Sequence, residues 1–347
     1  MAPQLPRLHA RLPVPLSAQV AIEKEHVTCA LCGGASYRLV AQGTDREYPT
    51  SPDRFDIVEC GACSLRYLNP RPTVKELGRI YPQNYHAYNI RAPGSTEASQ
   101  PLVTRLRHKI YSRRFRRVFQ HLAGRPQVEM LDVGCGDGWM LDLYKLASPK
   151  PIATHGVDFN REVCDVARSY GHTVYCARFE DLDLAGRFDI VNLSHVIEHV
   201  SDPLLIARKS FEVLRPGGLF VLETPNTDTL DGKWFESGNW GAYHVPRHWN
   251  LFNPATLRQL GEKAGLEFVE VSFNPAPVHW VWSFHNVAVG KRGGFWRAVE
   301  RTFAPLDVFG GGLKAFLQLG TFTLFDLAVK AVSGRTSNMM MIFRKAA

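Results

Sequence analysis

Residues 128–140 read V-E-M-L-D-V-G-C-G-D-G-W-M, and this stretch decides the fold of the 347-residue chain. It begins as an apolar run of strand type and ends in three glycines spaced two apart, Gly134, Gly136 and Gly138. Glycine has no Cβ and tolerates positive φ, so a ligand can lie directly against this backbone. Helical spacing follows over residues 139–147. The order strand, glycine turn, helix predicts free backbone N–H groups that point at a ligand.

The glycine spacing argues against two other nucleotide-binding motifs. The third glycine comes one residue too early for the pattern G-x-G-x-x-G, and no Gly-Lys-Ser/Thr follows for a Walker loop. Asp158 lies 20 positions beyond Gly138, at the end of a second apolar segment, 151–157. A carboxylate there can accept hydrogen bonds from both hydroxyls of a ribose. The sequence therefore favours a ligand that contains a nucleoside.

These residues resemble the class I S-adenosylmethionine-dependent methyltransferases, and three later segments extend the resemblance. Residues 179–182 (F-E-D-L) are similar to the adenine-side segment, and 188–200 (F-D-I-V-N-L-S-H-V-I-E-H-V) to the fourth strand and its loop. Residues 214–218 (L-R-P-G-G) resemble the turn before the fifth strand. The resemblance covers about residues 125–275 and the C-terminus. It implies an enzyme whose cofactor contacts are Asp132, Gly134, Gly136, Gly138, Asp158, Phe159, Glu180, Asp181, Ser194 and His195.

Strand and helix patterns alternate through this region. We expect strands at 128–133, 152–157, 173–176, 187–193, 218–223 and 266–273, and helices at 139–147, 160–170 and 202–214. A further helix has Asn253 as its cap and ends at Gly265. Such alternation implies a parallel sheet with ligands at the carboxyl ends of its strands. With the family's antiparallel last strand at 338–344, this predicts an α/β, doubly wound, seven-stranded, mostly parallel sheet in a methyltransferase domain over 125–347.

Two C-x-x-C pairs precede this domain. Their four cysteines are Cys29, Cys32, Cys60 and Cys63, and about 27 residues separate the pairs. Each pair can give two thiolates to one tetrahedral zinc, which predicts a zinc ribbon over residues 26–72. The alternative is a reduced or redox-active pair. Many methyltransferases that resemble this chain carry such a ribbon, and with four cysteine ligands we expect the zinc to be structural.

Composition and charge set further limits. The chain is 45% hydrophobic and 21% charged, has a formal net charge of +8, and carries seven Lys or Arg within residues 105–117. We expect a disordered tail over 1–25, a linker and basic helix within 73–124, and no apolar run of the ~18 residues that a membrane span needs. The cysteine usage fits a reducing, cytoplasmic location. The basic helix, 102–122, is interpreted as a solvated face over the sheet edge, with phospholipid or RNA contact as the alternative.

The tyrosine-rich segment 81–88 has two readings. Similar segments in the family lie over the cofactor, whereas aromatic packing between the ribbon and the catalytic domain explains the composition equally well.

Candidate bases come from the loops after strands four and five. His195, Glu198 and His199 form H-x-x-E-H, which also matches an inverted zinc-peptidase signature, but that signature needs a continuous helix and these residues leave a strand. In the ubiquinone-pathway O-methyltransferases, which this segment resembles, E-x-x-E-H can hold a divalent cation. Here His195 replaces the first glutamate, which argues against magnesium. We expect Glu198 and His199 to tie the loop together and His195 to face the cofactor.

The loop after strand five, 224–252, is long enough to be functional. It contains His244 and His248, and either could take a proton from the acceptor; with His195 they are the predicted catalytic residues. The alternative is that both histidines satisfy loop carbonyls.

An aromatic-rich insertion, 274–337, separates strand six from the last strand. Its composition suits a helical cap over the site, a homodimer surface or an interfacial membrane anchor. Relatives with a ribbon suggest O- or C-methylation of a small-molecule acceptor, such as a sugar, a glycolipid or a secondary metabolite. The alternatives are RNA methylation, against which no RNA-base motif is present, and a non-catalytic module that binds the cofactor.

Overall fold

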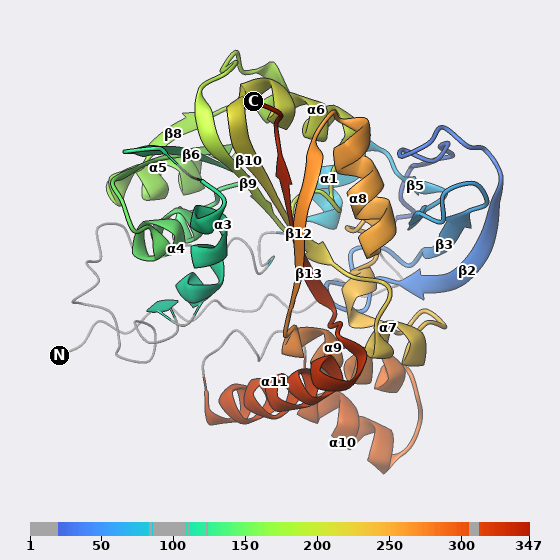
Figure 1. The fold of residues 1–347 in the computed structure, drawn as a ribbon. Helices are drawn as coiled ribbons and strands as arrows, with labels where there is room; N and C mark the ends of the chain where they lie inside the picture. The colour runs from blue at the N-terminus through green and yellow to red at the C-terminus, as the bar shows by residue number, and fades with distance from the viewer. Residues whose placement is uncertain (1–19, 83–84, 86–107, 110, 123, 305–311) are drawn as a thin grey trace.

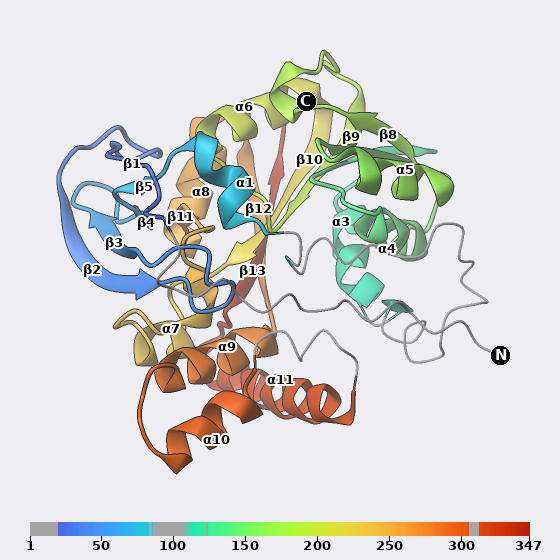
Figure 2. The same cartoon turned by 180° about the vertical axis from the view of Figure 1, so that it is seen from behind.

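The computed structural model describes residues 20–82, 85, 108–109, 111–122, 124–304 and 312–347. A twisted central sheet carries helices on both faces, a small strand-rich module lies to one side, and three helices lie together at one end (Figures 1 and 2). The predicted tail and the Gly/Ser/Pro-rich part of the linker fall almost entirely outside the described residues. The prediction that the disordered tail extends to residue 25 is wrong, because Lys24–Glu25 forms β1, which pairs with β5 (Arg71–Pro72).

The central sheet has seven strands in the order β12-β13-β10-β9-β6-β7-β8. β13 runs antiparallel to both of its neighbours, and the other pairs are parallel. The strands are β6 (Val128–Val133), β7 (Ile152–Asp158), β8 (Thr173–Cys176), β9 (Phe188–Ser194), β10 (Leu214–Pro225), β12 (Glu267–Asn274) and β13 (Asn338–Arg344). The predicted fold class is confirmed, with strand ends within a few residues of the expected ones.

Local capping explains where the flanking helices begin. They are α4 (Trp139–Ala147), α5 (Arg161–Ser169), α6 (Pro203–Val213) and α8 (Pro254–Lys263). The side chains of Asn160, Asp202 and Asn253 each accept a backbone N–H in the first turn of α5, α6 and α8. A side-chain oxygen at this position satisfies one of the orphan donors of a helix start. These caps fix the chain direction as it leaves the carboxyl end of each strand.

The core lies on both faces of the sheet. One apolar cluster includes Leu193, Leu222 and Phe343, and the other includes Ile190, Val221 and Ile342. Neighbouring residues on a strand thus face opposite layers, and the apolar side chains of both layers are buried. Strands buried on both faces are continuously apolar, which is why these runs predict well from sequence.

The N-terminal module shares a sheet with the loop after strand five. β2 (Tyr37–Thr44), β3 (Arg54–Cys60) and β4 (Arg66–Leu68) continue into β11 (Asn250–Leu251), in the order β11-β4-β3-β2. A 3-10 turn, η2 (Val74–Glu76), and α1 (Leu77–Ile80) follow β5. Because β11 belongs to the methyltransferase-like part of the chain, the N-terminal module and that domain share one four-stranded sheet.

The described end of the basic segment packs inward. It comprises η5 (Arg113–Phe115) and α3 (Arg116–Gln120), whose Phe115, Val118 and Phe119 join the core. Arg114 and Arg117 pair with Glu223 and Glu270 of the central sheet. These two side chains therefore attach the basic segment to the central sheet.

Helices dominate the remaining segments. α7 (Leu230–Trp234) and η7 (Gly241–Tyr243) lie in the long loop after β10. The insertion forms α9 (Pro277–Ala288), α10 (Gly294–Thr302) and α11 (Leu313–Ser333), and these are the three helices at one end in Figure 1. The predicted helical insertion before the last strand is confirmed. α11 differs from expectation, because it is long and apolar enough to cross a membrane although Lys314, Asp326 and Lys330 interrupt its apolar run.

Candidate active site

The glycine turn after β6 requires glycine at two positions for space. Gly134, Gly136 and Gly138 all have positive φ, at 72°, 51° and 83°. A Cβ on Gly134 would lie 2.6 Å from Cγ2 of Val196, and one on Gly138 would lie 2.7 Å from Cδ2 of His172. A Cβ on Gly136 would meet no atom within 4 Å. The turn is therefore tight beneath and open above Gly136, as a backbone that receives a ligand must be.

Asp158 lies beside this turn at the end of β7. Its carboxylate accepts hydrogen bonds from the backbone N of Gly136 (3.1 Å) and of Asn160 (2.9 Å). Burial raises the pKa of Asp158, and the backbone hydrogen bonds oppose this. The next residue, Phe159, is 77% exposed. An ionisable carboxylate and an uncovered aromatic ring at a strand end suit a ribose and an adenine.

Asp132 lies beneath the turn and is buried. Its Oδ1 accepts from Nδ2 of Asn192 (2.7 Å), whose Oδ1 in turn accepts from the hydroxyl of Tyr144 (2.9 Å). Burial raises the pKa of Asp132 to about 7. The side chain thus supports the turn through a buried network.

The adenine-side segment forms η6 (Phe179–Asp181) near the end of β8. Phe179 packs in the core, which leaves Glu180 and Asp181 at the surface side of the turn. Glu180 accepts a hydrogen bond from Arg178 (2.7 Å).

Glu223 organises the carboxyl end of β10. Arg114 holds its two carboxylate oxygens at 2.6 and 2.9 Å, and Ser194 donates to it at 3.0 Å. The amide of Asn338 also donates to it, at 2.7 Å. These contacts join β9, β10, β13 and η5 at the edge where the ligand half of the sheet begins. The sequence signal for Glu223 is an acidic residue inside the apolar run L-F-V-L-E-T.

His195 stands between the glycine turn and a second polar cluster. It has a positive φ of 54°, and its side chain is 42% exposed. Its Nδ1 lies 3.0 Å from Oε1 of Glu198. Desolvation lowers the pKa of His195, but the hydrogen bond and charge of Glu198 outweigh it and raise the pKa.

Glu198 is the buried hub of the second cluster. Its Oε2 accepts from the hydroxyl of Thr224 (3.0 Å), and its backbone O accepts from the N–H groups of Trp249 and Asn250. Burial would raise the pKa of Glu198, but the histidines around it lower the value to about 2. The carboxylate therefore stays ionised and ties the loop after β9 to the loop after β10.

His199 and His248 meet beside Glu198. Their ring centroids lie 4.6 Å apart. Nδ1 of His199 lies 2.9 Å from the hydroxyl of Tyr81, and Nδ1 of His248 lies 2.8 Å from the carbonyl O of Ala242. Burial lowers the pKa of both histidines, that of His248 well below its ordinary value. Both rings are therefore neutral near pH 7.

His244 is held by a carboxylate from the N-terminal module. Its Nδ1 is hydrogen-bonded to Oε2 of Glu47, and its Nε2 lies 3.3 Å from the hydroxyl of Tyr85. The ring stacks on Trp282 of α9 at 5.4 Å between centroids. Its backbone is left-handed, with a φ of 41°. His244 and Glu47 are both nearly enclosed, and burial raises the pKa of Glu47 well above its ordinary value.

Arg247 and Asp45 form a fully buried ion pair behind His244. Two N–O contacts, of 3.1 and 2.8 Å, join the guanidinium to the carboxylate. The guanidinium also lies over the ring of Tyr48, 4.7 Å from its centroid. Breaking such a pair leaves an uncompensated buried charge, at a cost of ~3–5 kcal/mol. The pair therefore clamps the loop between β2 and β3 against the loop after β10.

Comparison with known proteins places the chain in a family. Residues 104–271 match the family described as Methyltransferase domain. The Ubiquinone biosynthesis O-methyltransferase of Cereibacter sphaeroides (strain ATCC 17025 / ATH 2.4.3) is 30% identical over 251 residues, which cover 67% of this chain and 91% of that protein.

The chain belongs to the class I S-adenosylmethionine-dependent methyltransferases.

Other similar proteins carry related names. A Probable S-adenosylmethionine-dependent methyltransferase of Mycolicibacterium smegmatis is 33% identical over 159 residues, which cover 45% of this methyltransferase and 58% of that protein. A solved SAM-dependent methyltransferase from Archaeoglobus fulgidus matches with a TM-score of 0.43 and 18% identity, over 69% of this chain and 94% of its own.

The cofactor of this methyltransferase is S-adenosylmethionine, and the glycine turn fits it. The open face of Gly136, the carboxylate of Asp158 and the exposed ring of Phe159 lie on one edge of the sheet. The individual contacts predicted at these residues, and at Glu180, Asp181, Ser194 and His195, stay predictions.

Sequence reasoning missed two residues of the histidine cluster. Asp45 and Glu47 lie about 200 positions before their partners, in a loop with no recognisable motif. Tyr81 and Tyr85 contact His199 and His244, as the packing interpretation of the tyrosine-rich segment expects, and a place over the cofactor stays a prediction. Residues 83–84 and 86–88 of this segment lie outside the described part of the chain.

Magnesium does not fit the polar cluster of the methyltransferase. The ligand atoms of Glu198, His199 and His248 lie within 4.8 Å of one another. Magnesium prefers oxygen ligands, whereas this set offers one carboxylate and two neutral imidazoles. Such a set suits a first-row transition metal instead. We therefore assign no step of the reaction to magnesium.

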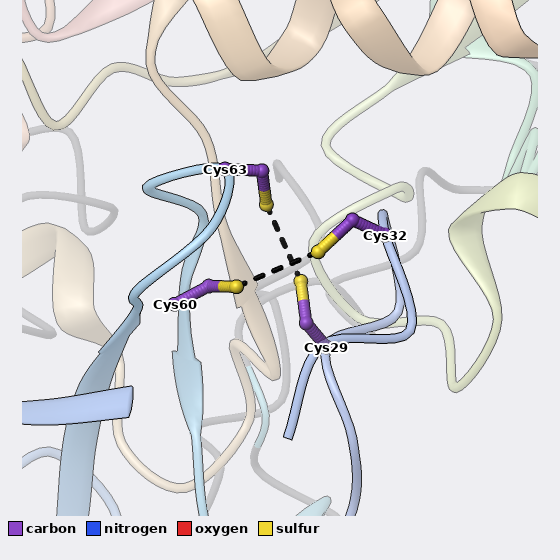
Figure 3. Close-up of side chains that lie close together, drawn as sticks. All are labelled: Cys29, Cys32, Cys60 and Cys63. Atoms are coloured by element: carbon purple, nitrogen blue, oxygen red, sulfur yellow. Dashed lines mark hydrogen bonds between the residues drawn. The ribbon is translucent and has the colours of Figure 1, made fainter. Parts of the chain in front are cut away.

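The four ribbon cysteines converge on one point (Figure 3). Their sulfurs lie within 4.8 Å of one another, and those of Cys29 and Cys63, and of Cys32 and Cys60, are each 3.5 Å apart. Tetrahedral zinc with bonds of about 2.3 Å would place its sulfurs about 3.8 Å apart. The four thiols are therefore compatible with a zinc site.

Proposed function

We propose that this methyltransferase methylates a hydroxyl oxygen of a small-molecule acceptor and that His244 accepts the hydroxyl proton. The support for oxygen as the acceptor atom is the name of the relatives, O-methyltransferase. The support for His244 is its geometry, because a carboxylate holds one ring nitrogen and the other lies among aromatic side chains. This geometry is the single observation that carries the proposal.

Three histidines compete for the role of base. Nδ1 of His248 faces a carbonyl, and its low pKa makes it a weak proton acceptor. Nδ1 of His195 faces Glu198, and its place beside the glycine turn suits the cofactor half. Glu47 orients the ring of His244 through its hydrogen bond to Nδ1, at the position that the carboxylate of a catalytic triad occupies. We therefore assign the proton to Nε2 of His244 and call Glu47 a positioning residue.

The chain contributes alignment and proton removal. S-adenosylmethionine, when bound, supplies a methyl group on a positively charged sulfur. The glycine turn and Asp158 hold the cofactor, and the loops after β9 and β10 hold the acceptor opposite it. Alignment is worth up to ~7–11 kcal/mol, and a positioned base adds ~10²–10⁴-fold. With the cofactor bound, the acceptor oxygen would take the methyl group, S-adenosylhomocysteine would leave, and the hydroxyl proton would move to Nε2 of His244, whose Nδ1 faces Glu47.

Aromatic side chains suggest the kind of acceptor. Tyr48, Tyr81, Tyr85 and Trp282 surround the histidine cluster. Such walls suit a sugar ring, a planar metabolite or the head of a glycolipid. The acceptor reaches this cluster from the carboxyl side of the strands. A cytoplasmic location agrees with the free cysteines.

The proposal includes a structural zinc ion held by Cys29, Cys32, Cys60 and Cys63. Burial raises the pKa of Cys29 to about 11, so a metal is needed to hold that thiol ionised near neutral pH. Zinc would brace β3 and the module that delivers Glu47 to His244.

The direct test is transfer of a labelled methyl group to pooled cell lipids, glycans and RNA. We expect the label in lipids, glycans or another small-molecule fraction, in an ether linkage that resists mild base. Label in RNA would overturn the acceptor class, and no transfer to any pool, with cofactor binding intact, would indicate a non-catalytic module.

A further inference from the structure

One face of α11 is apolar and uncovered. Positions 315, 318, 319, 322, 323, 326, 329 and 330 are buried or half-buried, which is one stripe of a helix. The remaining positions are exposed, and after Lys314 they hold Phe316, Leu317, Gly320, Thr321, Leu324, Phe325, Leu327, Ala328, Ala331, Val332 and Ser333. Phe316 and Leu324 are 69% and 70% exposed. A helix that faced only water would carry charges on this side.

α11 is tethered to the domain and lies along it. Asp326, in its third quarter, accepts from the backbone N of Ala276 and from Nε1 of Trp280, both at 2.7 Å. β13 of the central sheet begins at Asn338, shortly after the helix ends. By length and composition α11 could span a bilayer, with a mean hydropathy of 1.4 and only 11% of that window buried. Spanning would break both hydrogen bonds and place Asp326 in lipid, so the helix is suited to lie on a membrane.

α10 extends the apolar face and adds charge. Phe295 is 69% exposed, and Lys314 of α11 donates to the carbonyl O of Arg301 at 2.7 Å, which joins the two helices. Exposed cations surround the pair, namely Lys291, Arg292, Arg297, Arg301 and Lys314. Among the described residues of 289–304 and 312–337, no acidic side chain is exposed.

We propose that α10 and α11 form a lipid-binding face that docks the enzyme on an anionic membrane surface. Apolar side chains at such a surface enter the headgroup boundary while cations meet lipid phosphates. A second copy of the chain fits less well, because a two-fold interface would bring the same cations of both copies toward each other. This proposal does not depend on the identity of the acceptor.

The docked face lies one helix away from the histidine cluster. Trp280 of α9 packs against Phe322 and Phe325 of α11, with centroids 6.0 and 4.9 Å apart. Trp282 of the same helix stacks on His244. Docking would therefore hold the acceptor side of the enzyme near the bilayer.

The test is co-sedimentation of the full chain with phosphatidylcholine vesicles, with and without phosphatidylglycerol. We expect binding to the anionic vesicles that falls at least about tenfold in Phe316→Gln/Leu324→Gln, because both apolar anchors are lost. Arg297→Gln/Arg301→Gln should weaken binding by on the order of tenfold and remove much of its salt dependence. The matched control is Leu39→Gln/Val74→Gln, two exposed apolar residues of the N-terminal module, which should bind as the unmodified enzyme does.

Cofactor affinity, measured on each variant, confirms that the fold is retained. Protein that stays in the supernatant with anionic vesicles at low salt would overturn the proposal. So would equal loss in the control variant. A dimer in velocity sedimentation that Phe316→Gln/Leu324→Gln dissociates, without vesicle binding, would show that the face joins two copies instead.

Discussion

Replacing Asp158 by alanine should weaken S-adenosylmethionine binding at least tenfold. The carboxylate braces the turn through the backbone N of Gly136 and lies where both ribose hydroxyls are expected. Leaving buried or ligand-facing polar groups unpaired costs ~1–3 kcal/mol for each group. A loss of about 1.4 kcal/mol is already tenfold in affinity, so two unpaired hydroxyls, at about 2–6 kcal/mol together, give from about thirtyfold to on the order of 10⁴-fold.

Isothermal titration calorimetry measures this affinity directly. Asp165→Ala is the matched control, because it removes an aspartate from α5 whose carboxylate pairs only at the surface with Arg168. The control should bind the cofactor as the unmodified enzyme does. An Asp158→Ala variant that is folded and binds with unchanged affinity would refute the assignment of the ribose contact.

Three further outcomes are expected. Elemental analysis should find one zinc per chain, lost in Cys29→Ser/Cys60→Ser; zinc that is absent or survives the double substitution would contradict the four-cysteine site. The raised pKa of Asp132, about 7 against an ordinary 3.8, means that the folded state holds a proton which the unfolded state releases between these values. The stabilisation from this proton is therefore fully present below about pH 4 and is lost as the pH rises through 7. Between these values Tm should fall less in Asp132→Asn than in the unmodified enzyme, and equal slopes of Tm against pH would contradict the raised pKa of Asp132. Magnesium added to enzyme that a chelator has stripped of metal should not raise the rate of methyl transfer. Full recovery of activity with magnesium alone would mean that the Glu198 cluster binds magnesium.

Local sequence patterns predict the cofactor half of this enzyme. β6, its glycine turn and α4 follow one another within about 20 residues, so periodicity, glycine and caps are enough to place them. β13 could be placed only through the family resemblance, because the insertion separates it from β12.

The acceptor half depends on contacts between distant segments. Glu47 reaches His244 and Asp45 reaches Arg247 only because β11 joins the N-terminal module to the loop after β10. Neither β11, with two residues, nor the loop between β2 and β3 has a periodic pattern. The ion pair of Arg114 could not be predicted from the sequence for the same reason, since its partner Glu223 lies 109 positions away.

The most direct test of the proposed chemistry compares His244→Ala with His248→Ala under saturating cofactor and acceptor. We expect kcat to fall ~10²-fold or more in His244→Ala, with cofactor affinity nearly unchanged, because a positioned base is lost. His248→Ala, which removes a ring of low pKa, should lower kcat less than about tenfold. If both variants keep kcat within about threefold of the unmodified enzyme, alignment alone drives the reaction and His244 is not the base.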